Sequence, residues 1–292
     1  MRIRLIMPFC VAFILTITFT SVYSQTRPKN YYRDTIHFEN APRRLNNKYP
    51  LSDQKNSGSW VLDKVHSDEF NAKKLNEERW FPNNPSWKGR QPTQFHASNV
   101  SLNKGNAEFR INQHGDDKLL PGYTHTSGFI VSKQKFLYGY FEARLKINDS
   151  PWVGGYWMCN HERHWWTEID MCENCPGNPE RRNELCFNVH VFHSPKDQGD
   201  VKKHFDKPVK FYIPFELQKD FHVWGMDWNK DFITIYMDGV EYYKIENTHW
   251  HQALRVNFNN ESNKWFGALP NGEGEDEVYL VDYFRVWQKS NK

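Results

Sequence analysis

Apolar and polar residues alternate along several segments of the chain from residue 60 onward. Between positions 140 and 147, every second residue is apolar: Phe141, Ala143, Leu145 and Ile147. This period of two predicts a strand with one buried face. Further strands are expected at 221–228, 232–236, 241–245 and 277–287. Long helical periodicity is absent, so the pattern favours an all-β sandwich or barrel of antiparallel strands.

A short turn between two of these segments supports the same fold class. Asp238–Gly239 separates the strands expected at 232–236 and 241–245. An Asp-Gly pair between alternating segments is a strong hairpin signal, because both turn residues adopt positive φ readily.

The N-terminus has the three parts of an export signal. Arg2 and Arg4 precede an apolar run over residues 5–20, and Val22 and Ser24 provide small residues before a cleavage point. A transmembrane anchor is the alternative, but the run is short for a span of roughly 20 residues. We therefore expect a signal peptide at 1–24 and a secreted or periplasmic mature chain. No later stretch is expected to span a membrane.

The rest of the chain divides into a polar lead-in and one domain. Residues 25–58 contain Pro28, Pro42, Pro50 and the polar run 53–58. They are expected to be extended, either weakly structured or draped on the domain. Residues 59–292 form the expected single folded domain, without internal repeats.

Composition and charge exclude some classes of protein. The chain is 38% hydrophobic and 25% charged, which disfavours disorder and a polytopic membrane protein. Its 12 Trp, 14 Tyr and 21 Phe suit a β-rich protein, and also one that stacks flat ligands or sugar rings on exposed aromatic rings. Without Arg2 and Arg4, the net charge of +3 becomes +1, which gives no basic footprint for nucleic acid.

Three acids stand close together at Glu168, Asp170 and Glu173. On a strand, alternate side chains share a face, so Trp166, Glu168 and Asp170 point the same way. Glu173 falls on the opposite face of a regular strand. One bulge residue near 171–172 would return it to the face of the other two acids.

Such a cluster fits glycosidic cleavage, which needs two carboxylates facing one cleft. One attacks the anomeric carbon or activates water, and the other protonates the leaving oxygen. A third acid can position the nucleophile and tune both pKa values. A solvated acidic strand edge is the plain alternative, but Trp165 and Trp166 beside the cluster disfavour it.

The spacing Glu-x-Asp-x-x-Glu resembles the catalytic signature of glycoside hydrolase family 16 in its bulged-strand form. Other segments resemble that family in the same order: 67–71, 87–90 with 97–100, 126–130, 138–144, 220–223 with 236–239, and 281–286. The resemblance covers roughly residues 60–288. Within the family the chain is most similar to marine β-agarases and β-porphyranases and less to κ-carrageenases. Trp87 with Arg90, and Glu261 before 265–267, carry that likeness.

The resemblance implies a β-jelly roll of two stacked antiparallel sheets with a concave substrate cleft. It implies an endo-acting, retaining enzyme in which Glu168 is the nucleophile, Glu173 the general acid/base and Asp170 the acid that holds Glu168. The expected substrate is a red-algal galactan, porphyran or agar. The expected chemistry needs no cofactor, and a monomer is expected.

Substrate contacts are expected from aromatic and charged residues around the cleft. Trp87 lies in the loop 82–92, where it can stack on galactose, and Arg90 can hold sulfate through paired N–H donors. Arg163 is a second sulfate candidate. A surface tryptophan and solvated arginines are the alternatives. The other candidates are Trp157 and Trp166 as the cleft floor, with strand parity favouring Trp166, His190 beside the acids, and Glu261 as a sugar-binding residue.

Four cysteines remain after the signal segment: Cys159, Cys172, Cys175 and Cys186. Cys172 and Cys175 have zinc-ligand spacing, but a strand context and export disfavour zinc. One disulfide bracing the loop 174–185 is expected, with free buried thiols as the alternative. The segment 161–164 is one residue short of a zinc-protease motif and is set aside.

The resemblance also implies a possible structural calcium on the convex side, to which Glu69 and Asp282 are matched. Three rival functions remain open. The same fold can act on carrageenan or laminarin. A lectin-like sandwich can bind carbohydrate without turnover. A transglycosylase can transfer the covalent intermediate to sugar.

Overall fold

We describe the protein from a computed structural model, which covers residues 35–113, 119–196, 203–264 and 278–290. The expected signal peptide at 1–24 and the segment 265–267 lie outside the described residues. The fold is nearly all β, and its two large sheets are antiparallel, as predicted.

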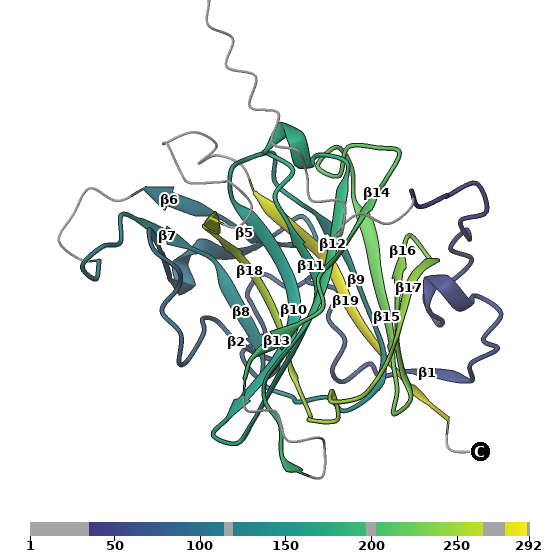
Figure 1. The fold of residues 1–292 in the computed structure, drawn as a ribbon. Coiled ribbons are helices and arrows are strands. Elements are labelled where there is room, and N and C mark those ends of the chain that lie inside the picture. The colour runs from purple at the N-terminus through teal and green to yellow at the C-terminus, as the bar shows by residue number, and fades with distance from the viewer. Residues whose placement is uncertain (1–34, 114–118, 197–202, 265–277, 291–292) are drawn as a thin grey trace, which may run out of the picture. The chain divides into compact units, whose positions relative to one another are not determined.

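The first large sheet carries the acidic strand near its middle (Figure 1). Its path runs through β13 (Phe205–Asp206), β12 (Glu184–His193), β11 (Trp165–Asn174), β10 (Val153–Glu162), β18 (Arg255–Glu261), β8 (Phe129–Ser132) and β2 (Trp80–Phe81), and β14 (Val209–Tyr212) pairs with β12.

The second large sheet forms the other layer of the sandwich. Its path runs through β17 (Val240–Glu246), β16 (Phe232–Met237), β15 (His222–Trp228), β9 (Gly139–Lys146), β19 (Tyr279–Lys289), β5 (Asn106–Phe109) and β4 (Val100–Asn103), and β1 (Trp60–Leu62) pairs with β19.

A small sheet and short helical turns complete the described fold. The small sheet contains β3 (Thr93–Phe95), β7 (His125–Ser127) and β6 (Ile111–Gln113), and β3 pairs with β7 in parallel. The 3₁₀ turns are η1 (Leu51–Asp53), η2 (Ala97–Asn99) and η3 (Pro179–Arg181). Across the described ranges, no helix has the length and apolar character to cross a bilayer.

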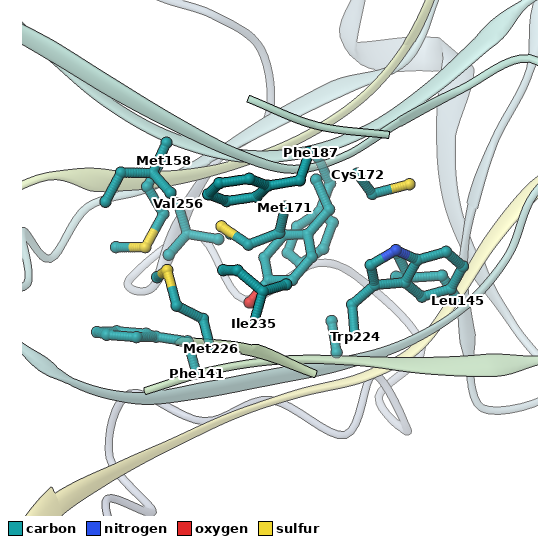
Figure 2. Close-up of a cluster of buried hydrophobic side chains, with 14 of the residues drawn as sticks. Phe141, Leu145, Met158, Met171, Cys172, Phe187, Trp224, Met226, Ile235 and Val256 are labelled. Carbon is teal, nitrogen blue, oxygen red and sulfur yellow. The ribbon is translucent and has the colours of Figure 1, made fainter. Parts of the chain in front are cut away.

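The core lies between the two large sheets. Figure 2 shows side chains from both layers meeting there, with Met171 and Phe187 from the acidic sheet and Phe141, Trp224 and Ile235 from the other. All five are buried. Because core side chains leave each strand at alternate positions, the opposite face of the acidic sheet is free to carry polar residues.

The predicted alternation is confirmed where it can be tested. Residues 140–146 lie in β9, and 222–228 form β15. The Asp238–Gly239 turn joins β16 to β17, and both turn residues have positive φ, 48° and 80°. That geometry matches the right-handed twist of the two strands.

The outer face of β9 differs from the pattern, which predicted only one buried face. Glu142 is fully buried, because residues from the polar lead-in cover it. The Leu51 N–H donates to Glu142 Oε2 at 2.7 Å, the Tyr283 hydroxyl donates to Oε1 at 2.9 Å, and Arg44 forms an ion pair with the same carboxylate. Ile36 also enters the main core cluster. The described part of the lead-in therefore lies on the domain.

Candidate active site

The acidic strand β11 contains the bulge that the spacing of its acids predicts. In the pairing with β10, Trp157 is opposite Asp170 but Tyr156 is opposite Cys172, so Met171 is the inserted residue. Met171 and Cys172 both enter the core. The strand parity changes at this point, and Glu173 returns to the face of Glu168 and Asp170.

Burial and mutual repulsion favour protonation within this cluster. Burial, followed by the charge of Asp170, raises the pKa of Glu168. The same two causes, with Glu261, raise the pKa of Glu173 well above its usual range. Burial raises the pKa of Glu261 to about 7, although Arg90 opposes the shift. Such a group can keep one acid protonated near neutral pH, as acid catalysis requires.

His190 on β12 is the cation beside the acids. Its Nε2 lies 3.1 Å from Asp170 Oδ2 and 3.9 Å from Glu168 Oε1. Burial by itself lowers the pKa of His190. The hydrogen bond and charge of Asp170, with the charges of Glu168 and Glu173, overcome this and raise the pKa to about 9. The predicted position of His190 beside the carboxylates is thus what the structure shows.

Arg90 and Trp87 lie together and contact residues of β18, β8 and β10 of the same sheet. The Arg90 guanidinium lies 5.7 Å from the centre of the Trp87 ring, and its Nε donates to Glu261 Oε2 at 3.3 Å. The Ser262 hydroxyl donates to the Arg90 carbonyl at 2.8 Å, which fixes the loop against β18. Trp87 also packs edge-on against Phe95 at 4.9 Å. The loop tryptophan therefore has a packing role, which the sequence did not predict.

Trp157 connects this aromatic cluster to the acids. It is opposite Asp170 on one side and Asn257 on the other, and its Nε1 donates to Asn259 Oδ1 at 2.7 Å. Two positions along β10, Gly155 is paired with both Glu173 and Asn259. A Cβ at Gly155 would lie 2.5 Å from the Asn259 Oδ1, so the glycine leaves room for the Asn259 side chain.

Trp166 has both ring faces covered. His161 stacks on one face and Phe192 on the other, each with ring centres 4.1 Å apart. A sugar ring therefore meets only the edge of Trp166. Parity placed this residue on the correct side of the sheet, but the neighbouring rings leave Trp157 as the better candidate for the cleft floor.

Arg163 is exposed in the turn between β10 and β11. This turn follows Glu162, the last residue of β10, at the end of the hairpin away from Glu173. The two sulfate candidates therefore occupy different ends of the site, and the structure does not bring Arg163 and Arg90 together.

The expected disulfide is wrong, because all four cysteines are free. Cys172 contacts the Asn174 Oδ1 at 3.5 Å, and Cys186 contacts the Glu184 Oε1 at 3.3 Å. Burial raises the pKa of all four thiols. The alternative prediction of free thiols is confirmed, with Cys172, Cys175 and Cys186 buried and Cys159 partly buried.

Glu69 and Asp282 do not fit a calcium site. Both line a pocket of about 470 Å³ on the second sheet, together with Arg44, Arg144 and Arg285. Arg285 holds Glu69 through two hydrogen bonds of 2.7 and 2.8 Å, and Arg144 holds Asp282 at 2.7 Å. Arginine already pairs with each carboxylate, so neither is available to a hard cation.

Sequence reasoning missed the polar ladder of β18. Asn257 and Asn259 alternate with buried apolar Val256 and Phe258, and they lead to Glu261 on the same face. That alternation was visible in the sequence and could have identified both asparagines. Cys159, which lies opposite Glu168, was named only as a possible disulfide partner.

The chain is similar to known polysaccharide-degrading enzymes. The β-porphyranase B of Zobellia galactanivorans is 28% identical over 255 residues, which cover 78% of this chain and 85% of that protein. The β-porphyranase B of Phocaeicola plebeius is 25% identical over 314 residues, covering 94% of each chain. The crystal structure of porphyranase B from Zobellia galactanivorans superposes with a TM-score of 0.69 at 25% identity, covering 78% of this chain and 92% of that one.

The family model of the β-porphyranase A–D GH16 domain matches residues 60–289, from the start of β1 to the end of β19. The match spans both large sheets and includes the bulged acidic strand. The fold is therefore the predicted jelly roll, and the chain is a retaining endo-glycosidase. It belongs to glycoside hydrolase family 16, in the group of β-porphyranase A–D domains.

Proposed function

We propose that this chain is a secreted, monomeric hydrolase that cleaves β-linkages inside a red-algal galactan, porphyran or agar. The observation that carries the proposal is the bulge at Met171, which puts Glu168 and Glu173 on one face with Asp170 between them. The pattern of residues 1–24 supports export.

In the first step, the Glu168 carboxylate attacks the anomeric carbon. The bond from that carbon to the leaving oxygen breaks, and Glu173 gives its proton to that oxygen. The raised pKa of Glu173 keeps the proton available for this transfer. The product is a sugar joined covalently to Glu168.

In the second step, Glu173 takes a proton from water as the water oxygen attacks the anomeric carbon. The bond between the anomeric carbon and Glu168 breaks, which restores the Glu168 carboxylate. The sugar is released with its original configuration at the anomeric carbon. The chain's own side chains supply the acid, the base and the nucleophile, so the proposed reaction needs no cofactor.

Asp170 and His190 prepare the nucleophile. Glu168 has to be ionised to attack, although burial and Asp170 favour its protonated form. The positive charge of His190 opposes both effects, because it lowers the pKa of Glu168 and of Glu173. We propose that Asp170 keeps Glu168 in place and that His190 limits the repulsion between them.

The residues around the acids support a galactan substrate. Trp157, and beyond it Trp87, provide apolar surface on which the flat face of a galactose ring can stack. Asn259 and Glu261 are buried beside that surface, where they accept hydrogen bonds from Trp157 and Arg90. Arg90 uses its Nε toward Glu261, and its two Nη groups carry the donors that a sulfate group would take. The similarity to two β-porphyranases supports the same class.

The test is release of reducing ends from agarose, porphyran, κ-carrageenan and laminarin, with Glu168→Gln as the control. We expect wild-type activity on porphyran or agarose and none from the variant. Turnover only on κ-carrageenan or laminarin would overturn the galactan assignment but keep the mechanism. Binding to one polymer without turnover of any would leave a lectin-like function. Transfer of the cleaved sugar to added oligosaccharide in place of water would indicate a transglycosylase.

A further inference from the structure

His204 is a histidine for which the proposed reaction has no use. It lies just before β13, and its Nε2 is 2.9 Å from Nδ1 of His190. The opposite ring nitrogen of His190, Nε2, faces the Asp170 carboxylate at 3.1 Å. His204 therefore contacts the site through the imidazole of His190, and among the described contacts it has no hydrogen bond or ion pair to any of the three acids.

A ladder of stacked rings fixes the plane of His204. Its ring lies 4.3 Å from Phe192 at an interplanar angle of 7°. Phe192 stacks on Trp166, and Trp166 stacks on His161, each at 4.1 Å. The ladder thus has a histidine at each end, and of these two described histidines His204 is the one that is hydrogen-bonded to His190.

Two groups lie beside His190 Nε2, and the one to which this nitrogen is hydrogen-bonded depends on whether it carries a proton. Asn188 Oδ1 accepts from the backbone N–H groups of Val189 and Lys207, at 2.9 and 3.1 Å. The Asn188 amide nitrogen consequently faces Nε2, at 2.9 Å. A protonated Nε2 donates to Asp170. A deprotonated Nε2 accepts from Asn188.

The other nitrogen of His190 carries a proton in both states. A neutral imidazole that accepts at Nε2 has its proton on Nδ1, and an imidazolium has protons on both nitrogens. His204 Nε2 is then the acceptor throughout, provided that His204 is neutral. Burial, followed by the charge of His190, lowers the pKa of His204, which agrees with a neutral ring.

We propose that His204 is a positioning residue that holds a proton on Nδ1 of His190, so that His190 gains and loses its proton only at Nε2, against Asp170. The hydrogen bond sets the tautomer of His190, and the ring ladder sets the angle at which His204 accepts. This inference rests on the proposed function only in that the acids served are the catalytic ones.

The charged groups that face His190 come from two neighbouring strands as well as from His204. From β11 they are Glu168, Asp170 and Glu173, and from β13 the register partner is Asp206. The acids stabilise the imidazolium, and His204 adds an acceptor for its second N–H. Removing that acceptor lowers the pKa of His190, so its positive charge is lost at a lower pH. The pKa values of Glu168 and Glu173, which that charge lowers, then rise.

The first arm of the test needs no substrate. Full-length protein with ¹⁵N-labelled histidine is titrated by NMR as wild type, His204→Phe and His161→Phe. The two variants replace the two ends of the same ladder with a ring that stacks, but only His204→Phe removes an acceptor from His190. We expect wild-type His190 to deprotonate at Nε2, His204→Phe to give mixed tautomers and a midpoint lower by about half a pH unit, and His161→Phe to match wild type.

A wild-type His190 that deprotonates at Nδ1 would overturn the proposal, even if a variant failed to fold. Equal changes in His204→Phe and His161→Phe would also overturn it, because stacking alone would then explain them. In the second arm, both limbs of the pH profile of kcat/KM should move to higher pH in His204→Phe only. Absence of turnover on every polymer would count against the proposed function and leave the NMR result to decide this inference.

Discussion

Two glutamates, one on each large sheet, have opposite surroundings: Glu142 is fully buried and Glu168 is partly buried. Glu142 on β9 accepts from the Leu51 N–H and the Tyr283 hydroxyl and pairs with Arg44. Glu168 on β11 faces Asp170, and the cation paired with it among the described residues is His190, at 3.9 Å. The first carboxylate has the donors and the cation that an anion needs, whereas the second is crowded by another acid.

The difference separates a carboxylate that holds the fold from one that does chemistry. Removing one partner of a buried, fully paired charge is strongly destabilising, because the other charge is left uncompensated. A buried charge that is repelled is costly while the pair is intact, and its pKa shifts as a result. Perturbed acids in a cleft are candidates for catalysis on that ground. The same substitution at the two sites should therefore have opposite consequences.

The largest effect should come from Glu168→Gln. An amide cannot form the glycosyl intermediate, so kcat should fall by at least about 10³-fold. Ligand binding and fold should survive, because Gln is nearly isosteric. Turnover on the best polymer of the panel gives the rate, and affinity electrophoresis in the same polymer gives the binding. If Glu168→Gln kept wild-type turnover, Glu168 would not be the nucleophile.

Glu173→Gln should lose less activity on substrates with an activated leaving group than on the polymer. Loss of general acid/base catalysis typically costs 10²–10⁴-fold. A leaving group that needs no proton should allow the first step, and azide should then release the sugar as an azide of retained configuration. Glu168→Gln is the matched control, since it forms no covalent intermediate. Rescue with inverted configuration would exchange the roles of the two residues.

Replacing each of the two glutamates with Gln should change the stability of the fold in opposite directions. Glu142→Gln leaves Arg44 without its anion, and we expect a loss of about 2–3 kcal/mol and a Tm lower by about 5–10 °C. Glu168→Gln should instead raise Tm at pH 7. The pKa of Glu168 is higher in the folded than in the unfolded chain, so the wild type loses stability as pH rises from the unfolded toward the folded value. The variant has no proton to lose in that window.

Calorimetry at pH 4 and pH 7 tests this directly. The gain in Glu168→Gln should be present at pH 7 and small at pH 4, where the wild-type carboxyl is protonated in both states. Activity per folded molecule should remain in Glu142→Gln. A lower Tm in both variants would show that the two carboxylates are both structural.

The acidic site could be predicted because its information is local. The odd position of Glu173 relative to Glu168 requires a bulge, and the structure places that bulge at Met171. The alternation along residues 140–147 predicted the core-facing side of β9 for the same reason. The second face was missed, because Arg44 reaches Glu142 from 98 positions away and the lead-in has no apolar period.

Ring contacts were harder to predict than strand faces. Parity put Trp166 on the correct side of the sheet, but it does not specify which neighbours cover a ring. His161 and Phe192 come from the two adjacent strands, and their stacking on Trp166 is set by register. His204 lies outside any alternating pattern, so only the folded chain brings it to His190.

The smallest effect should come from Arg90→Ala, and it depends on the polymer. Loss of a charge-assisted contact to sulfate should cost about 10–100-fold in kcat/KM on porphyran. On agarose the change should stay within about threefold, because burial already favours a neutral Glu261 and its pKa rises further when Arg90 is absent. Arg163→Ala, in the exposed turn at the other end of the site, is the matched control. Equal losses on both polymers would mean that Arg90 serves the packing of Trp87 and the loop, and that sulfate is read elsewhere.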